Sequence, residues 1–161
     1  MGSEMCIRDR YNSPRVTHDL DLAIRTLDVD KVISIMYENN YYLVKDVSKD
    51  SAVIAQFQKD AADWVENKKA GSMTFIALDK QPKTGAVQLK DIDITTQIDF
   101  LFELSIPIIK MKQRAWEVTI NKEKILIASK KDLLVLKQNR KDKSSADYAD
   151  IAFLKSIIKN D

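Results

Sequence analysis

The sequence predicts an α/β (α+β) fold, and three observations support this prediction. A strand pattern at residues 15–24, a helix pattern at 29–39 and a strand pattern at 41–44 follow one another within about thirty residues, as in α/β proteins. Two further strand patterns occur at 72–78 and 95–102. The C-terminal part of the chain adds helices that begin with capping-box signatures.

Composition sets the class of protein. The chain has 161 residues, of which 45% are hydrophobic and 31% charged, which fits one domain with its own core. The formal net charge of +2 and the lack of a dense Lys/Arg block do not indicate a nucleic-acid binder. The apolar runs are far shorter than a membrane span and no signal-peptide pattern occurs, so we expect a soluble, cytoplasmic protein without a membrane partner. Because Cys6 is the only cysteine, a disulfide framework and a cysteine metal site are excluded.

The first ten residues are treated separately because they show neither a helical nor a strand period. The run Met-Cys-Ile-Arg-Asp-Arg at residues 5–10 resembles a translated sequencing-adapter remnant. We therefore expect residues 1–10 to be a non-native or disordered N-terminus. A single domain is expected over residues 11–161.

The strand predicted at residues 15–24 carries closely spaced acids. Side chains alternate along a strand, so Thr17, Asp19 and Asp21 share one face, and the apolar residues fall mainly on the other. Two carboxylates on one face repel each other unless a cation lies between them, and hard cations such as Mg²⁺ prefer oxygen ligands. A metal site is therefore one interpretation of this strand. A solvated strand face that carries two acids is the other.

The next elements follow from apolar spacing and stop signals. The helix at 29–39 has Asp28 as its expected N-cap and Asn39-Asn40 as its stop. The pair of tyrosines at 41–42 opens the strand at 41–44. Residues 53–57 fit a strand.

The middle of the chain alternates between helix, strand and turn patterns. Residues 61–67 fit a short helix, and residues 72–78 fit a strand that follows a glycine. Residues 80–85 contain Pro82 and a final glycine and are expected to form a turn. Residues 87–94 are acidic and weakly patterned, so a connection or an edge strand is expected there.

The strand predicted at residues 95–102 contains a third acid. Ile98 and Phe100 fall on one face and Asp99 falls on the other. Burying an unpaired carboxylate is costly, so Asp99 needs a partner, a cation or an exposed sheet edge.

The C-terminal part is expected to contain one short helix, a hairpin and two capped helices. Proline is well placed in a first helical turn, so Pro107 opens the short helix. Ser129 to Asp132 and Ser144 to Asp147 both have capping-box spacing. The predicted elements cover residues 107–115, 116–120 with 125–128, 130–139 and 145–159.

Lys137 is a candidate binding residue because it shares the apolar face of its helix, three and four residues after two leucines. In one interpretation its stem snorkels along the core edge, and in the other its ammonium reaches a phosphate. Asp147 and Asp150 border the apolar face of the last helix. Either acid is placed to pair with Lys137 or Arg140, and the alternative is an acid that stabilises the first turn through the helix dipole.

Four motifs in one order resemble the minimal bacterial and archaeal branch of the nucleotidyltransferase superfamily. That branch includes the toxin components of abortive-infection and toxin–antitoxin systems. The motifs are RVTHDLDL at residues 15–22, IDFL at 98–101, SKKDLLVLK at 129–137 and DYADI at 147–151, ahead of Leu154.

The resemblance implies a mixed β-sheet flanked by helices, with the two acid-bearing strands adjacent. Asp19, Asp21 and Asp99 would then form a catalytic triad that binds Mg²⁺ or Mn²⁺. Two such cations stabilise the attacking and leaving oxygens of an in-line displacement. The expected reaction moves a nucleotidyl group from a nucleoside triphosphate to a protein, RNA or small-molecule acceptor, with Asp99 as a general base.

The resemblance also assigns residues around the nucleotide. Arg15, Thr17 and Lys137 would bind the nucleotide, and the two cations among them would offset phosphate charge in the transition state. Asp147 and Asp150 would act as structural residues that support this group. A cognate antitoxin is the expected protein partner.

One departure and two alternatives accompany this interpretation. The family usually places a Gly-Gly or Gly-Ser turn on a helix upstream of the first acid strand, and residues 1–14 do not supply it in a plausible setting. We therefore expect an N-terminally truncated enzyme that binds Mg²⁺ or Mn²⁺ weakly and shows little or no nucleotidyl transfer. A catalytically silent nucleotide- or partner-binding module of the same fold is the first alternative. A two-metal nuclease is the second, and the near-neutral net charge argues against it.

Overall fold

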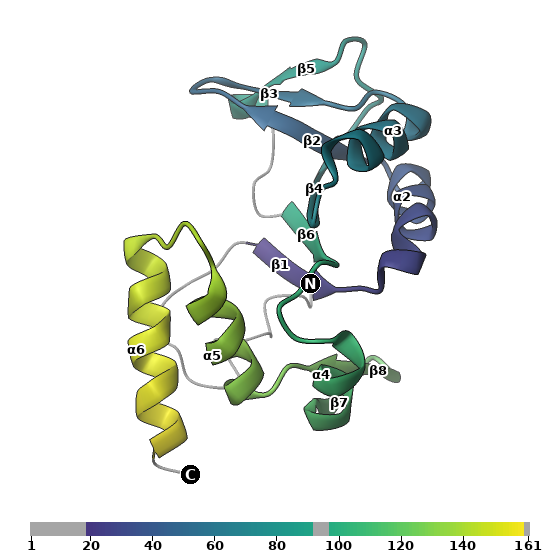
Figure 1. Ribbon diagram of the computed structural model, residues 1–161. Coiled ribbons are helices and arrows are strands. Elements are labelled where there is room, and N and C mark those ends of the chain that lie inside the picture. The colour runs from purple at the N-terminus through teal and green to yellow at the C-terminus, as the bar shows by residue number, and fades with distance from the viewer. Residues whose placement is uncertain (1–18, 92–96, 160–161) are drawn as a thin grey trace. The chain divides into compact units, whose positions relative to one another are not determined.

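The computed structural model describes residues 19–91 and 97–159, and the chain forms two compact units (Figure 1). The N-terminal unit covers residues 16–103, and the C-terminal unit contains the chain from residue 104 onward. Each unit is described by itself.

A six-stranded sheet is the main feature of the N-terminal unit. Its strand order is β1-β6-β4-β2-β3-β5. The edge strand β1 runs parallel to β6, and every other neighbouring pair is antiparallel, so the sheet is mixed. The strands are β1 (Asp19–Ala23), β2 (Tyr41–Val47), β3 (Ser51–Ile54), β4 (Ser72–Ala77), β5 (Ala86–Gln88) and β6 (Gln97–Leu101).

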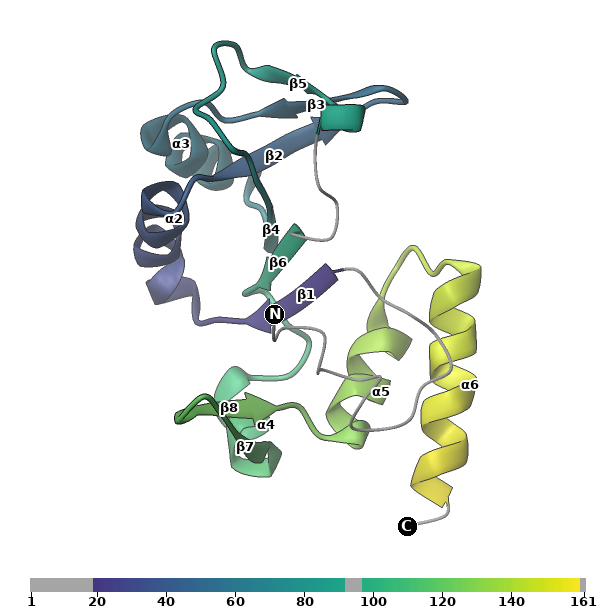
Figure 2. The ribbon, with the colours of Figure 1, turned by 180° about the vertical axis from the view of Figure 1, so that it is seen from behind.

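Two helices cover one face of this sheet. Helix α2 (Val29–Glu38) follows the short helix η1 (Thr26–Asp28), and α3 (Gln58–Lys68) connects β3 to β4. A second short helix, η2 (Leu89–Asp91), follows β5. Both long helices lie on the same side of the strands in Figures 1 and 2, and their apolar side chains enter one core with those of the sheet. The buried members of that core are Val29, Ile33, Met36, Leu43, Ala55, Ala61, Val65, Met73, Phe75 and Phe100.

Phe75 is fully buried at the centre of this core. Its ring makes edge contacts with Phe100, at 5.8 Å between ring centroids, and with Tyr37, at 6.4 Å. Such edge-to-face pairs are favourable beyond the apolar area that they bury. A smaller cluster, of Tyr42, Ala52, Ile54 and Ile76, packs apart from this core.

The predicted α+β class, with a mixed sheet flanked by helices, is confirmed in this unit, and so are the helix at 29–39 and its stop at Asn39. The predicted N-cap position of α2, Asp28, is also confirmed, but the expected capping hydrogen bond is absent. The Arg25 guanidinium instead donates to both Asp28 oxygens, at 2.7 and 2.8 Å, because an ion pair three residues apart is the stronger local interaction.

The strand predicted at residues 53–57 is also displaced. Strand β3 ends at Ile54, and Phe57 is the N-cap of α3 with its side chain 54% exposed. The Gln56 side chain donates to the carbonyl of Pro82 at 2.8 Å. The weakly patterned segment after Gly85 contains the short edge strand β5, as one of its two interpretations predicted.

The C-terminal unit contains a short helix, a hairpin and a pair of helices. They are α4 (Ile108–Arg114), β7 (Trp116–Ile120), β8 (Glu123–Ile127), α5 (Lys130–Asn139) and α6 (Ser145–Lys159). Asn121 and Lys122 both have positive φ, which is the geometry of a two-residue hairpin turn that matches strand twist. Helices α5 and α6 pack side by side and antiparallel (Figures 1 and 2).

Both predicted capping serines cap their helices, and the full reciprocal capping box forms at α6. The Ser129 hydroxyl accepts from the backbone N–H of Asp132 at the start of α5. At the start of α6, the Ser144 hydroxyl accepts from the Asp147 N–H, and the Asp147 carboxylate accepts from the Ser144 N–H at 3.0 Å. These reciprocal bonds satisfy backbone donors that a helix leaves unpaired. Across residues 19–91 and 97–159, no helix has both the length and the apolar character needed to cross a bilayer.

Candidate functional site

The sheet brings two of the predicted acids to paired positions. Strands β1 and β6 are parallel neighbours, with Asp21 opposite Asp99 and position 19 opposite Gln97. Paired residues of neighbouring strands point to the same face, and adjacent strands lie about 4.8 Å apart. The Asp21 and Asp99 side chains are therefore neighbours, although 78 positions separate them in the sequence.

These acids occupy the sheet face that α2 and α3 do not cover. Alternation along β6 puts Ile98 and Phe100 against the helices, and both belong to the main core. Asp99 points the other way, and so does Thr74, its partner across β4. The sequence thus produces one apolar face that anchors the strands and one face that carries polar groups.

Asp99 has an incompletely satisfied carboxylate. Its Oδ2 accepts a hydrogen bond from the Gln97 amide at 3.1 Å. Its Oδ1 is buried and has no hydrogen-bond partner among the residues that the structure describes. A buried carboxylate oxygen without a partner is unfavourable, so a cation or a hydrogen-bond donor at this atom would stabilise it.

The donor set of this site fits a hard divalent cation. Asp21 and Asp99 supply carboxylate oxygens, which Mg²⁺ and Mn²⁺ prefer, and a cation between them would offset their mutual repulsion. Among the described side chains, no three acidic, histidine or cysteine residues are grouped in a way that could hold a metal ion. Asp19 contributes its backbone to β1, two positions before Asp21, but its side chain lies outside the described residues.

Two further predicted residues cannot be placed. Arg15 and Thr17, which were assigned to the nucleotide, fall outside the described residues. Their roles and that of Asp19 stay predictions.

The remaining predicted residues form a charge cluster in the C-terminal unit. The Lys137 ammonium donates to Asp147 at 3.1 Å and to Asp150 at 2.7 Å. Arg140 adds a hydrogen bond to Asp147 at 3.1 Å. Lys137 is thus held between the last turn of α5 and the first turns of α6, and its predicted contact with a phosphate stays a prediction.

Asp147 is the anchor of this cluster, since it is only 3% exposed. Burial by itself disfavours its ionised form. The N–H and hydroxyl of Ser144 and the ammonium of Lys137 outweigh that effect and hold the pKa of Asp147 well below its ordinary value. The carboxylate is therefore charged at neutral pH and ties α5 to α6.

Three residues near these acids and ion pairs were not singled out as site residues from the sequence. Gln97 orients Asp99, and Thr74 flanks it across β4. Alternation placed Gln97 on the face of Asp99, but the Thr74 pairing joins distant segments. The third is Asp132, which is 2% exposed and accepts from the Arg114 guanidinium, with Nε at 3.2 Å from Oδ2. Its capping-box position was the available signal.

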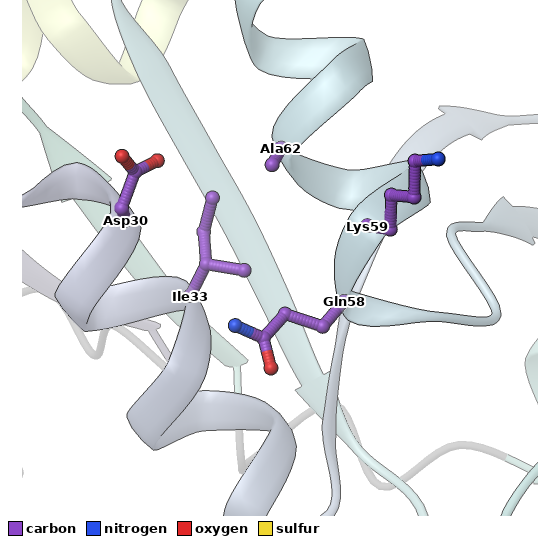
Figure 3. A pocket seen from close by; sticks show the side chains of 5 residues that line it. All are labelled: Asp30, Ile33, Gln58, Lys59 and Ala62. Carbon is purple, nitrogen blue, oxygen red and sulfur yellow. The ribbon is translucent and has the colours of Figure 1, made fainter.

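A surface hollow lies elsewhere in the N-terminal unit. It has a volume of about 360 Å³ and is lined from α2 and α3, so it lies on the helix-covered side of the sheet (Figure 3). Ile33 and Ala62 form its apolar part, and Asp30, Gln58 and Lys59 border it. This hollow is separate from the paired acids.

Comparisons with known proteins leave the family open. No protein-family model matches the chain, and no curated protein matches it. Among solved structures, the chain is similar to the lincosamide antibiotic adenylyltransferase LnuA with lincomycin bound. That match has a TM-score of 0.45 and 15% sequence identity, and it covers 90% of this chain and 77% of the other. These values are too low to assign an activity, so the candidate site rests on its own residues.

Proposed function

We propose that this protein is a metal-dependent nucleotidyltransferase whose cation site is built on Asp21 and Asp99. One observation carries the proposal: a buried Asp99 oxygen, which has no hydrogen-bond partner among the described residues, lies on the strand that pairs Asp99 with Asp21. The motif resemblance supports nucleotidyl transfer as the reaction. Asp19 would complete the triad, since strand alternation assigns positions 19 and 21 to the same face.

Each residue has a physical role in this proposal. Asp21 and Asp99 would hold Mg²⁺ or Mn²⁺, which when bound supply charge stabilisation for the attacking and leaving oxygens. Gln97 keeps one Asp99 oxygen engaged, so the other is directed to the cation or to an acceptor hydroxyl. An Asp99 carboxylate near that hydroxyl would accept its proton as a general base.

The substrates are assigned by the same resemblance. A nucleoside triphosphate would be the donor, with Arg15, Thr17 and Lys137 on its phosphates. The acceptor would be a protein, an RNA or a small molecule. A cytoplasmic role as the toxin of a toxin–antitoxin or abortive-infection system, with a cognate antitoxin as partner, completes the proposal.

Metal binding tests the site without requiring turnover. Mn²⁺ can be titrated into the protein, and free Mn²⁺ followed by electron paramagnetic resonance, with and without a non-hydrolysable nucleoside triphosphate. We expect Asp21→Asn and Asp99→Asn each to weaken Mn²⁺ binding at least tenfold, because each removes one of the few charged oxygen ligands. The exposed acid Asp79, in the loop after β4, offers the matched control Asp79→Asn, which should leave binding unchanged. Equal binding by all four proteins would end the proposal.

Transfer itself is tested with nucleoside triphosphates labelled at the α-phosphate. The protein is incubated with each nucleotide, Mg²⁺ and candidate acceptors, and label transfer is measured by gel or chromatography. The proposal expects at most weak transfer by this chain, and Asp99→Asn should abolish it. Mn²⁺ and nucleotide binding through Asp21 and Asp99 without transfer to any acceptor would favour the silent binding module instead.

A further inference from the structure

The net charge of the whole chain conceals two units of opposite sign. The described residues of the N-terminal unit contain ten Lys and Arg and fourteen Asp and Glu, a formal charge of −4. Residues 104–159 contain thirteen Lys and Arg against six Asp and Glu, a formal charge of +7. The net charge of +2 did not indicate a nucleic-acid partner. That value is the sum for the whole chain, whereas a partner can bind the basic unit alone.

The ion pairs that join the helices of the C-terminal unit engage three of its six acids and three of its thirteen cations, so ten cations and three acids of residues 104–159 lie outside these pairs. Asp132 and Asp147 are buried, and together with Asp150 they are engaged by Arg114, Lys137 and Arg140. Half of the acids of this unit are thus used to hold its helices together. Most lysines of the unit are exposed, including Lys131, Lys155 and Lys159.

These three lysines lie at one end of the α5–α6 pair. Lys137 contacts Asp147 and Asp150, which fixes the level at which the antiparallel helices pass each other. Lys131 lies six residues before Lys137, about 9 Å along the axis at 1.5 Å per residue. Because α6 runs in the opposite direction, about 9 Å along α6 beyond Asp147 and Asp150 corresponds to the level of Lys131. Lys155 lies at that level, and Lys159 lies about one turn further along.

Two other side chains border this end. The Asp132 carboxylate holds the half-exposed Arg114 at the first turn of α5. Trp116 begins β7 opposite Ile127, three residues before α5 starts, and its side chain is 47% exposed. We name Arg114, Trp116, Lys131, Lys155 and Lys159 the lysine end.

The placement of Lys131 is not explained by helix stability. A cation in the first turn of a helix opposes the helix dipole, and Lys131 has no acidic partner on the preceding turn. Cations grouped with a half-exposed indole are instead typical of surfaces that contact phosphates and stack bases. An acidic protein would use the cations but would gain little from the stacking surface.

We propose that the lysine end binds single-stranded nucleic acid, with the cations on the phosphates and Trp116 stacked on a base. The binding is distinct from nucleotidyl transfer, and it requires neither the metal site nor a nucleoside triphosphate.

Fluorescence anisotropy with labelled twelve-nucleotide oligouridylate and oligothymidylate tests this surface in the full chain. The triple variant Lys131→Gln, Lys155→Gln, Lys159→Gln removes three phosphate contacts. Each contact contributes about 0.7 to the slope of log affinity against log salt for single strands, so the slope should fall by about 2. Affinity at 0.1 M salt should fall on the order of 100-fold.

The matched control changes three exposed lysines of the N-terminal unit, as Lys49→Gln, Lys80→Gln and Lys83→Gln. It makes the same change in net charge and should leave affinity and slope nearly unchanged. Trp116→Leu should weaken oligonucleotide binding while leaving competition by poly-glutamate unchanged. Circular dichroism confirms that each variant is folded.

Three results would overturn the proposal. The first is wild-type protein that does not bind either oligonucleotide at low salt. The second is an equal loss in the two triple variants, which would reduce the effect to net charge. The third is poly-glutamate binding as tight as oligonucleotide binding with no effect of Trp116→Leu, which would indicate an acidic protein partner. Loss of metal binding with retained oligonucleotide binding would overturn only the proposed function.

Discussion

Asp99→Asn separates the needs of folding from those of the proposed site. The Asp99 and Asp21 carboxylates occupy paired positions on strands about 4.8 Å apart. Two like charges at that spacing repel by about 3.5 kcal/mol at an effective dielectric constant of 20 and by about 0.9 kcal/mol at 80. Asp21 is exposed, so the lower figure applies. Without metal, the variant should therefore be about 1 kcal/mol more stable, and its Tm should rise by about 2–4 °C.

Divalent metal should reverse this order. If Mg²⁺ binds the wild type with a Kd of about 1 mM, then 10 mM Mg²⁺ adds about 1.4 kcal/mol, or about 3–6 °C in Tm. Asp99→Asn leaves only a neutral amide at this position, which is a much weaker ligand for a divalent cation, and should show little or no shift with Mg²⁺.

Thermal melting by circular dichroism, with and without 10 mM Mg²⁺, measures both effects. Asp79→Asn changes an exposed acid of the same unit and should behave as the wild type. A lower Tm for Asp99→Asn in the absence of metal would refute the reasoning, because the carboxylate would then be a stabilising structural group. An equal Mg²⁺ shift in wild type and variant would remove Asp99 from the cation site.

Three further variants probe the two units. Asp147→Asn should lower stability at pH 7 by about 2–3 kcal/mol, because it removes a buried charge from paired cations. The folded-state pKa of Asp147 lies below its unfolded value, so the stability difference between wild type and variant is complete above about pH 5 and should shrink as the pH falls through 4 towards 2. Urea unfolding at several pH values measures this difference, and the control Asp142→Asn, at an exposed acid, should show no such pH-dependent loss of stability. Lys137→Met should cost about 2–3 kcal/mol in the same assay, because it leaves two carboxylates without their shared cation, and Mn²⁺ affinity in the absence of nucleotide should not change. Phe75→Ala should cost about 3–5 kcal/mol in urea unfolding, since it empties the fully buried centre of the core, and a cost below 1 kcal/mol would contradict that core.

The sequence predicted well what depends on local pattern. The alternation of side chains along the strand predicted that Asp99 lies on the opposite face from Ile98 and Phe100. The spacing of the capping residues predicted where α5 and α6 begin. Both signals arise from side-chain periodicity or from backbone donors within four residues.

What depended on long-range pairing was not readable. The resemblance implied that the two acid-bearing strands are adjacent, which the pairing of β1 with β6 confirms, but local pattern did not give the register that places Asp21 opposite Asp99 or the pairing of Thr74 across β4. The end of β3 was missed because Gln56 is drawn to the carbonyl of Pro82, far along the chain. The opposite charges of the two units became visible only when the unit boundary was known.

The most direct test of the central claim is where Mn²⁺ binds. Bound Mn²⁺ broadens the amide resonances of nearby residues, so a titration followed by two-dimensional NMR of the labelled chain locates the site. We predict that substoichiometric Mn²⁺ first broadens the amides around Asp21 in β1 and Asp99 in β6, and that Asp99→Asn removes this selectivity. Broadening that begins elsewhere in the chain, with β1 and β6 unaffected, would contradict the account.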